Sequence, residues 1–145
     1  MPQKEFIMRG QTASGLTEVL NFGGKDKGYA YRLVDFELYP SESIGTQGFE
    51  MIGTVTAAKT AVAPTDPNFN DEGLIATCYI VSPSHDKAQR LAVINDKFLI
   101  TQDLVLMVQD IQNAAVNWQC RFVMEKMTGP EEAATNYKQF TISDA

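Results

Sequence analysis

Alternation of apolar and polar residues dominates this chain, and it is clearest near the C-terminus. Between Val116 and Met127, one set of alternate positions carries the side chains of Trp118, Cys120, Phe122 and Met124. The positions between them carry Asn117, Gln119, Arg121 and Glu125. Successive side chains of a strand point to opposite faces of the sheet, so this pattern predicts an antiparallel strand with one buried face.

The same pattern recurs along most of the chain and predicts about eight strands. Turn-forming segments that return roughly every 8–12 residues favour a sandwich or barrel over βαβ units. Within one strand, Gly53 is predicted to form a bulge. The expected strands are Lys4–Arg9, Thr17–Phe22, Tyr29–Tyr39, Phe49–Thr56, Leu74–Val81, Gln89–Ile100, Asp103–Ile111 and Val116–Met127.

Polar and turn-forming segments fill the intervals between these strands. A hairpin-like connection is expected at Gly23–Gly28, and loops at Ser41–Gly48 and Pro64–Gly73. Ala57–Ala63 suits either a helix or extended chain. The resulting prediction is an all-β antiparallel sandwich in a single domain, residues 1–145, with a short C-terminal tail at 129–145.

The segment Asp103–Ile111 is apolar on both faces, which a strand in a simple two-sheet monomer does not require. One face carries leucines and a valine, while Val105 and Met107 lie on the other. Either a loop or the C-terminal tail covers the second face, or a neighbouring subunit does. Val105 and Met107 are therefore candidate interface residues.

Tyrosines follow one face of the predicted strand Tyr29–Tyr39. Tyr29, Tyr31 and Tyr39 alternate with a second set of mostly apolar positions. Tyrosine is enriched where one end of the ring is dry and the other is wet, as at protein interfaces. These three tyrosines complete the set of candidate interface residues, with local cover by the tail as the alternative.

Composition limits the range of functions. The 145 residues are 44% hydrophobic and 21% charged, which is typical of a folded globular protein and is enough for one core without a disulfide or metal. A net charge of −6 argues against direct contact with nucleic acid, since phosphate binding requires clustered Lys and Arg. No membrane span is expected, and the N-terminal MPQKEF has no apolar core of a secretory signal.

Two cysteines, Cys78 and Cys120, lie at apolar positions of predicted strands. A disulfide across the sheets would require their side chains to meet. Two reduced thiols in the core are the simpler interpretation, because small buried cysteines are common.

Three sequence motifs are candidates for chemistry. Gly10–Thr17 has the glycine spacing of a P-loop, but Leu16 stands where the lysine is required, which favours a hairpin loop. Asp66–Glu72 places oxygen ligands at alternate positions, yet it lacks the glycine and glutamate of an EF-hand, so a solvated acidic loop and a different calcium site remain the alternatives. The single histidine, His85, sits in a turn without a separate nucleophile and acid. No catalytic residue, cofactor or metal site is predicted, and the chain is not expected to be an enzyme.

The strand pattern resembles the single jelly-roll virion proteins of small icosahedral viruses and phages. About eight short strands, long polar loops and a final strand pair make up this resemblance, and the ending Asn117–Lys126 followed by Gly129–Thr135 is similar in style. The resemblance implies a capsid or capsid-associated protein located in the virion. Such a subunit would self-associate into a symmetric oligomer or shell, contact other virion proteins, and contain no catalytic set.

A carbohydrate-binding β-sandwich is the main alternative. In that protein Tyr29, Tyr31 and Trp118 would form a platform for the sugar, and Asp66–Glu72 would bind calcium. A small β-barrel enzyme or ligand carrier would need a polar constellation that the sequence does not show.

Overall fold

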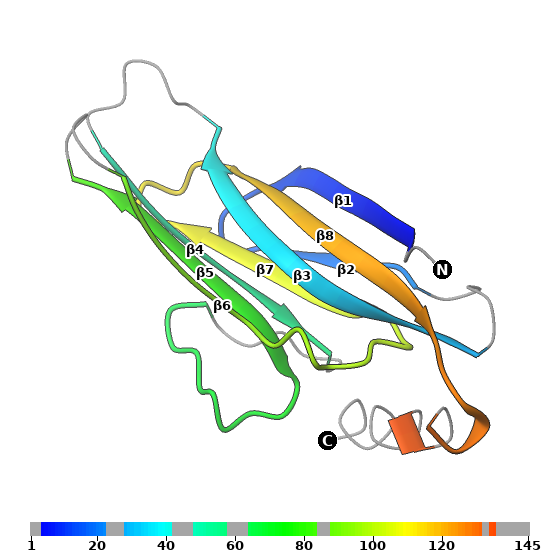
Figure 1. The fold of residues 1–145 in the computed structure, drawn as a ribbon. Coiled ribbons are helices and arrows are strands. Elements are labelled where there is room, and N and C mark those ends of the chain that lie inside the picture. Colours follow the sequence, from blue (N-terminus) through cyan, green and yellow to red (C-terminus); the bar gives the residue numbers. More distant parts are fainter. Residues whose placement is uncertain are drawn as a thin grey trace.

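Two antiparallel sheets built from eight strands face each other in the computed structural model (Figure 1). The strands are β1 (Lys4–Thr12), β2 (Thr17–Leu20), β3 (Tyr29–Pro40), β4 (Phe49–Thr56), β5 (Leu74–Ser82), β6 (Gln89–Ile94), β7 (Leu104–Asp110) and β8 (Val116–Lys126). One sheet has the order β1-β8-β3 and the other β2-β7-β4-β5-β6. The structure describes residues 4–22, 28–41, 48–57, 64–83, 88–131 and 134–135. The predicted all-β sandwich of eight strands is confirmed.

The core lies between the two sheets, where the inward-facing alternate residues of each strand meet. In β8, Trp118, Cys120 and Phe122 are buried, as the alternation predicts. Four aromatic rings pack around one end of this core, with centroids 5.0 to 6.2 Å apart, and they belong to Phe6, Phe22, Tyr31 and Phe122. Burial of these large side chains is the main term that holds the sheets together.

Strand β1 is longer than predicted. It continues through Gly10 to Thr12 and pairs with β8 over its whole length, so only Ala13–Leu16 remains for the turn. Gly10 is needed in the strand because the indole of Trp118 lies over it, and a Cβ at this position would be 3.0 Å from the ring. From the sequence alone, Gly10 is interpreted as part of a turn. In the structure, this glycine marks a close approach between neighbouring strands.

A β-bulge in β3 overturns the predicted division of that strand into two faces. The register against β8 shifts between Leu33 and Asp35, so Val34 is an extra residue. Tyr31 and Leu33 point into the core before the bulge, and Phe36 and Leu38 do so after it. Because one inserted residue reverses every later side chain, unbroken alternation assigns half of the strand to the wrong face.

Gly53 does not form the predicted bulge. It pairs regularly with Cys78 on one side and Val108 on the other, and the irregularity in β4 lies between Val55 and Thr56. A Cβ on Gly53 would lie 3.0 Å from the ring of Phe36. The glycine therefore lets the β3 side chains of the opposite sheet pack directly onto the β4 backbone.

Two other predicted strands end early. Strand β6 stops at Ile94, where the Asn95 side chain accepts a hydrogen bond from the Lys97 backbone and turns the chain. Further along, Ile100 forms an isolated bridge to Tyr31 of the other sheet. Strand β2 stops at Leu20, and the chain after it is fixed by a 2.6 Å hydrogen bond from the Phe22 backbone to Asp103.

Some predictions fall partly or wholly on residues that the structure does not describe. These are the connection at Gly23–Gly28, the turn that contains His85, the loop Ser41–Gly48, the ambiguous Ala57–Ala63 and most of the tail. The described part of the tail is helical at 129–131 and 134–135, and the Thr128 hydroxyl accepts a hydrogen bond from the Glu131 backbone as an N-cap. No helix among the described residues is long and apolar enough to span a membrane.

An ion pair joins β3 and β8 on the outer side of their sheet. Arg32 donates two 2.8 Å hydrogen bonds to the carboxylate of Glu125, and both side chains are about a quarter exposed (25% and 24%). A third bond runs from Arg32 to the backbone carbonyl of Asp96. The hydrogen bonds from Arg32 lower the pKa of Glu125 below its ordinary value.

Replacement of Glu125 by glutamine is expected to lower the free energy of unfolding by about 1 kcal/mol at pH 7, since a bidentate pair of this exposure is a moderate contributor. A carboxyl whose pKa is lowered by folding stabilises above its unfolded pKa and loses that contribution as the pH falls through its folded pKa. The difference from wild type should therefore disappear in acid. Urea unfolding at pH 7 and at pH 3 measures this difference in unfolding free energy. Glu37→Gln, at an exposed position of β3, is the control. A difference that persists unchanged in acid would contradict the prediction.

Candidate interaction surface

The two outer faces of the sandwich differ in chemistry. The three-stranded sheet presents a mostly polar outer face, on which Ile7 and Tyr39 are exposed hydrophobic exceptions. Its polar members are Glu5, Arg9, Gln11, Glu37, Gln119 and Arg121. A sheet face of this kind is suited to water.

The five-stranded sheet presents an apolar outer face. Leu104, Leu106 and Val108 of β7 are buried in the core, so the residues between them point outward. Val19 pairs with Val105 at one edge of the sheet, and Leu91 and Val93 pair with Tyr79 and Thr77 at the other. We call the six residues Val19, Leu91, Val93, Val105, Met107 and Ile111 the apolar outer face.

The described part of the loop between β4 and β5 lies beside this outer face. Thr65 is exposed and lines a pocket together with residues of β4, β5 and β7, and Phe69 lines a second pocket with Thr77 and Val93. Outward-facing Thr54 is fully buried. Cover of Val105 and Met107 by a loop stays a prediction, because the described part of the loop lies beside the middle strands. Val19, Leu91, Val93 and Ile111 are more than half exposed at the margins.

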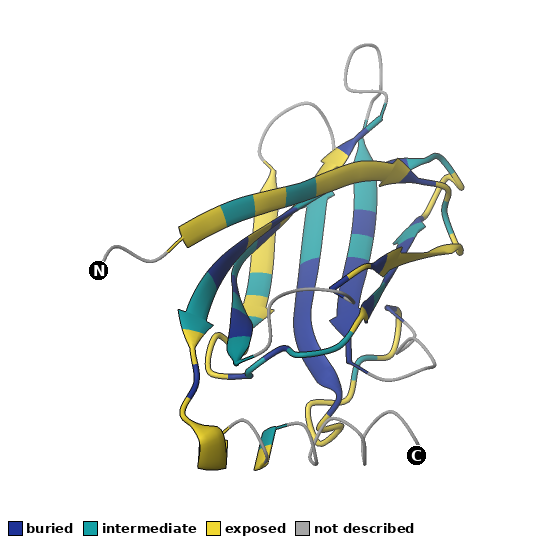
Figure 2. Ribbon diagram, turned by 90° about the vertical axis from the view of Figure 1, so that its right-hand side faces the viewer, coloured by how far each residue is buried: buried dark blue, intermediate teal, exposed yellow. Residues whose placement is uncertain are grey.

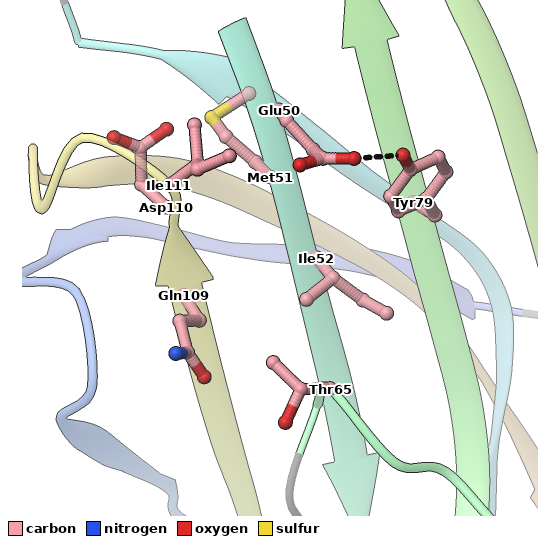
Figure 3. A pocket seen from close by; sticks show the side chains of 8 residues that line it. All are labelled: Glu50, Met51, Ile52, Thr65, Tyr79, Gln109, Asp110 and Ile111. Atoms are coloured by element: carbon pink, nitrogen blue, oxygen red, sulfur yellow. Dashed lines mark hydrogen bonds between the residues drawn. The ribbon is translucent and has the colours of Figure 1, made fainter.

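A pocket of about 290 Å³ opens where the loop meets the sheet (Figure 3). Its walls come from β4, β5, β7 and Thr65, and Ile52 and Ile111 make them partly apolar. The hydroxyl of Tyr79 donates a hydrogen bond to the carboxylate of Glu50 at one side, and this bond raises the pKa of the tyrosine. A mixed wall of this kind suits a side chain that has an apolar body and a polar end.

Asp110 also lines the pocket, but its carboxylate already has a structural task. One of its oxygens accepts hydrogen bonds of 3.0 Å from the backbones of Gln112 and Ala114. These bonds shape the β7–β8 turn, in which Asn113 has a positive φ of 59°. The burial of Asp110 therefore accompanies turn formation.

The candidate interface residues are not brought together on one surface. Tyr31 is buried in the core with 5% exposure, so its assignment to an interface is wrong, and the bulge in β3 is the reason. Tyr39 is exposed on the polar face, and Tyr29 is half-buried at the start of β3. Val105 and Met107 are half-buried and belong to the apolar outer face.

The sequence pattern missed the other members of the apolar outer face. Leu91 and Val93 alternate with Arg90 and Ala92 in β6, so a period of two was present there. Ordinary alternation assigns such apolar positions to the core, whereas here they point outward and Arg90 points toward β3. Arg90 reaches the Phe36 carbonyl at 2.6 Å, which fixes the orientation of β6.

The three candidate motifs have structural roles where the structure describes them. Gly10–Thr17 spans the end of β1 and a tight turn. In the loop Asp66–Glu72, Asn68 and Asp71 accept hydrogen bonds from backbone N–H groups of the same loop. Across the described ranges, no three His, Cys, Asp or Glu side chains are grouped to hold a metal ion.

Both cysteines are buried and free. Burial raises the pKa of Cys78 and that of Cys120, so both thiols are held in their protonated form. A thiol in this state is a poor nucleophile, and these side chains act as small core residues.

Comparisons with known proteins add no relative to this picture, since no family model matches the chain and a search of curated proteins finds no match.

Proposed function

We propose that this chain is a structural subunit of a virus or phage particle, a jelly-roll capsid or capsid-associated protein that acts through contacts with other subunits. The apolar outer face carries the proposal. Val19, Leu91, Val93 and Ile111 remain more than half exposed at its margins, and exposed apolar side chains gathered on one sheet face are typical of a surface that is covered in an assembly.

The strand pairings support the jelly-roll interpretation. In a jelly roll, the first four strands form a long hairpin with the last four, and this hairpin is then rolled up. The resulting pairs are β1 with β8, β2 with β7, β3 with β6 and β4 with β5. Three of these pairs are present as antiparallel ladders. For the fourth, β6 is hydrogen-bonded to β5 instead, but its Arg90 bonds to the backbone of β3 and faces Asp35 at 3.5 Å. Double-sheet jelly rolls are used by viral capsids and lectins.

Charge argues for protein partners over nucleic acid. Arg32, Arg90 and Arg121 each lie beside a carboxylate, so these cations do not form a free basic patch. With a net charge of −6, contact between the chain and a genome would be unfavourable. The expected partners are further copies of this chain and other virion proteins.

The carbohydrate-binding alternative is weaker, because its proposed platform is not at the surface. Trp118 is 8% exposed and Tyr31 is 5% exposed, and both point into the core. A sugar stacks on an exposed aromatic face, which neither residue offers.

Light scattering and negative-stain microscopy of the purified chain test the proposal. We expect rings of three, five or six copies, or closed shells, because symmetric closed contacts dominate protein assemblies. Assembly should survive or strengthen as salt rises, since salt screens the repulsion between acidic subunits. A strict monomer at high protein concentration in every salt condition, with no other protein present, would contradict it.

A pair of variants separates the apolar outer face from the rest of the surface. Leu91→Lys and Val19→Lys should each weaken assembly strongly, because each buries an unpaired charge in a contact. Gln119→Lys adds the same charge to the polar face, between Arg9 and Glu37, and should weaken assembly less. An equal loss in all three variants would mean that the apolar outer face is not the contact.

A further inference from the structure

The free edge of β1 is a second surface suited to association. β1 ends the three-stranded sheet, and in the part of the chain that the structure describes no strand pairs with its other side (Figure 2). At nine residues it is a long edge strand. The opposite edge of the same sheet differs, because β3 is engaged there by Ile100 and Arg90. An open edge presents a row of backbone N–H and C=O groups that another strand can satisfy.

The sequence of β1 is complementary to itself in one antiparallel register. Glu5 and Arg9 lie two residues to either side of Ile7, and all three point to the outer face. When Ile7 faces Ile7 of a second copy, Glu5 of each chain lies opposite Arg9 of the other. On the inner face, Phe6 then lies opposite Met8. Opposite charges and apolar pairs at facing positions both stabilise an antiparallel ladder.

Neighbouring registers lose this match. A shift by two residues in one direction sets Glu5 against Ile7, and a shift in the other direction sets Ile7 against Arg9. Shifts by one residue would join the outer face of one copy to the core face of the next. The charges of β1 therefore select the register in which Ile7 lies on the twofold axis.

Burial in the single chain is consistent with a missing neighbour at this edge. Phe6 and Met8 pack against the core but remain half-buried, and Ile7 is more than half exposed. Glu5 forms an exposed ion pair with Arg121 of the same chain, at 3.8 Å. Its carboxylate therefore stays accessible to a cation of a second chain.

We propose that β1 pairs antiparallel with β1 of a second copy around a twofold axis through Ile7, so that two three-stranded sheets become one sheet of six strands. The inference rests on the proposed function, to which it adds the dimeric contact from which larger assemblies are built. The occupant is a second copy of this chain, because the complementarity lies within β1 itself.

Cysteine cross-linking tests the pairing and its register. Facing Cα atoms of an antiparallel pair are about 4.5–5.5 Å apart, within reach of a disulfide. Ile7→Cys should therefore form a disulfide dimer under mild oxidation. Glu5→Cys and Arg9→Cys are the matched controls, because each thiol would be about 13 Å from its twofold mate at about 3.3 Å per residue, and should not cross-link. The double variant Glu5→Cys/Arg9→Cys should cross-link again. The native thiols are buried and do not interfere.

Charge reversal gives an independent measurement. Glu5→Arg and Arg9→Glu should each raise the dimer dissociation constant by about tenfold, because two facing pairs per dimer become repulsive. The double variant Glu5→Arg/Arg9→Glu should recover most of the affinity, as sedimentation velocity would show.

The outcomes separate this inference from the proposed function. If Ile7→Cys does not cross-link while the wild type still forms rings or shells, the β1 pairing is wrong and the function stands. If Ile7→Cys cross-links but the chain never exceeds a dimer, the pairing stands and the shell function is wrong. Equal cross-linking of Ile7→Cys and Glu5→Cys, or capture of a different protein at this edge in place of a second copy, would overturn the pairing.

Discussion

Replacement of Trp118 by alanine is expected to lower the free energy of unfolding by about 3–5 kcal/mol. The indole is buried between the sheets, lies over Gly10 and donates a 2.9 Å hydrogen bond to the hydroxyl of Thr12. The alanine variant leaves a cavity and removes the partner of a buried hydroxyl, and both effects destabilise. Urea unfolding followed by circular dichroism measures the change, since the variant has no tryptophan fluorescence.

Trp118→Phe is the matched control. It keeps an aromatic ring in the core but removes the hydrogen bond to Thr12 and the part of the indole that contacts Gly10, so the loss should be smaller than for alanine. Because Trp118 is the single tryptophan of the chain, its emission in the wild type reports burial directly. Emission at a solvent-exposed wavelength, together with an alanine variant as stable as wild type, would show that the indole is not in the core.

Gly53→Val is expected to destabilise by about 1–3 kcal/mol, although valine is the better strand residue. The Cβ of any side chain at this position would lie 3.0 Å from Phe36 and 3.3 Å from Leu38. Both neighbours are packed core side chains of the opposite sheet, so each would have to shift within a filled core. Chemical denaturation gives the change in free energy.

A double-mutant cycle with Phe36→Leu checks the cause. The smaller side chain opens space above β4, so Gly53→Val should cost less in the Phe36→Leu background, with a coupling of about 0.5–3 kcal/mol. Val55→Ala removes volume from the same strand without relieving the contact with Phe36, and it should show no such rescue. A Gly53→Val protein as stable as wild type would mean that the two sheets do not meet at this glycine.

The fold was largely predictable from the sequence, because burial of one sheet face imposes a period of two that can be read directly. The strand β8 shows this well, since Trp118, Cys120 and Phe122 face the core as predicted. Strand ends were less predictable. Gly10 and Gly53 look like turn or bulge signals, but each is small because an aromatic side chain lies over it. That reason is a tertiary contact, which local sequence does not contain.

The candidate surface was less predictable than the fold, again for physical reasons. Val105 and Met107 were identifiable because an apolar residue on both faces of a strand needs an explanation. Leu91 and Val93 were not identifiable as surface residues. Alternation shows that the two faces of a strand differ, but it does not show which face meets the core. The choice in β6 is made by a distant contact, the bond from Arg90 to β3. Tyr31 was assigned to the outer face because nothing in the sequence pattern reveals the bulge at Val34.

The bulge in β3 also restricts how this protein can change in length during evolution. Tyr31 and Phe36 both face the core although they are five residues apart, an odd separation that only an extra residue makes possible. Loss of Val34 alone would set Leu33 and Asp35 next to each other against Phe122 and Arg121, so every later side chain would keep its face and the strand would alternate regularly. A descendant that lost this residue would lose the bulge and keep the core. A single insertion or deletion far from the bulge would instead turn one half of the strand over, so length variants in this strand should occur at the bulge.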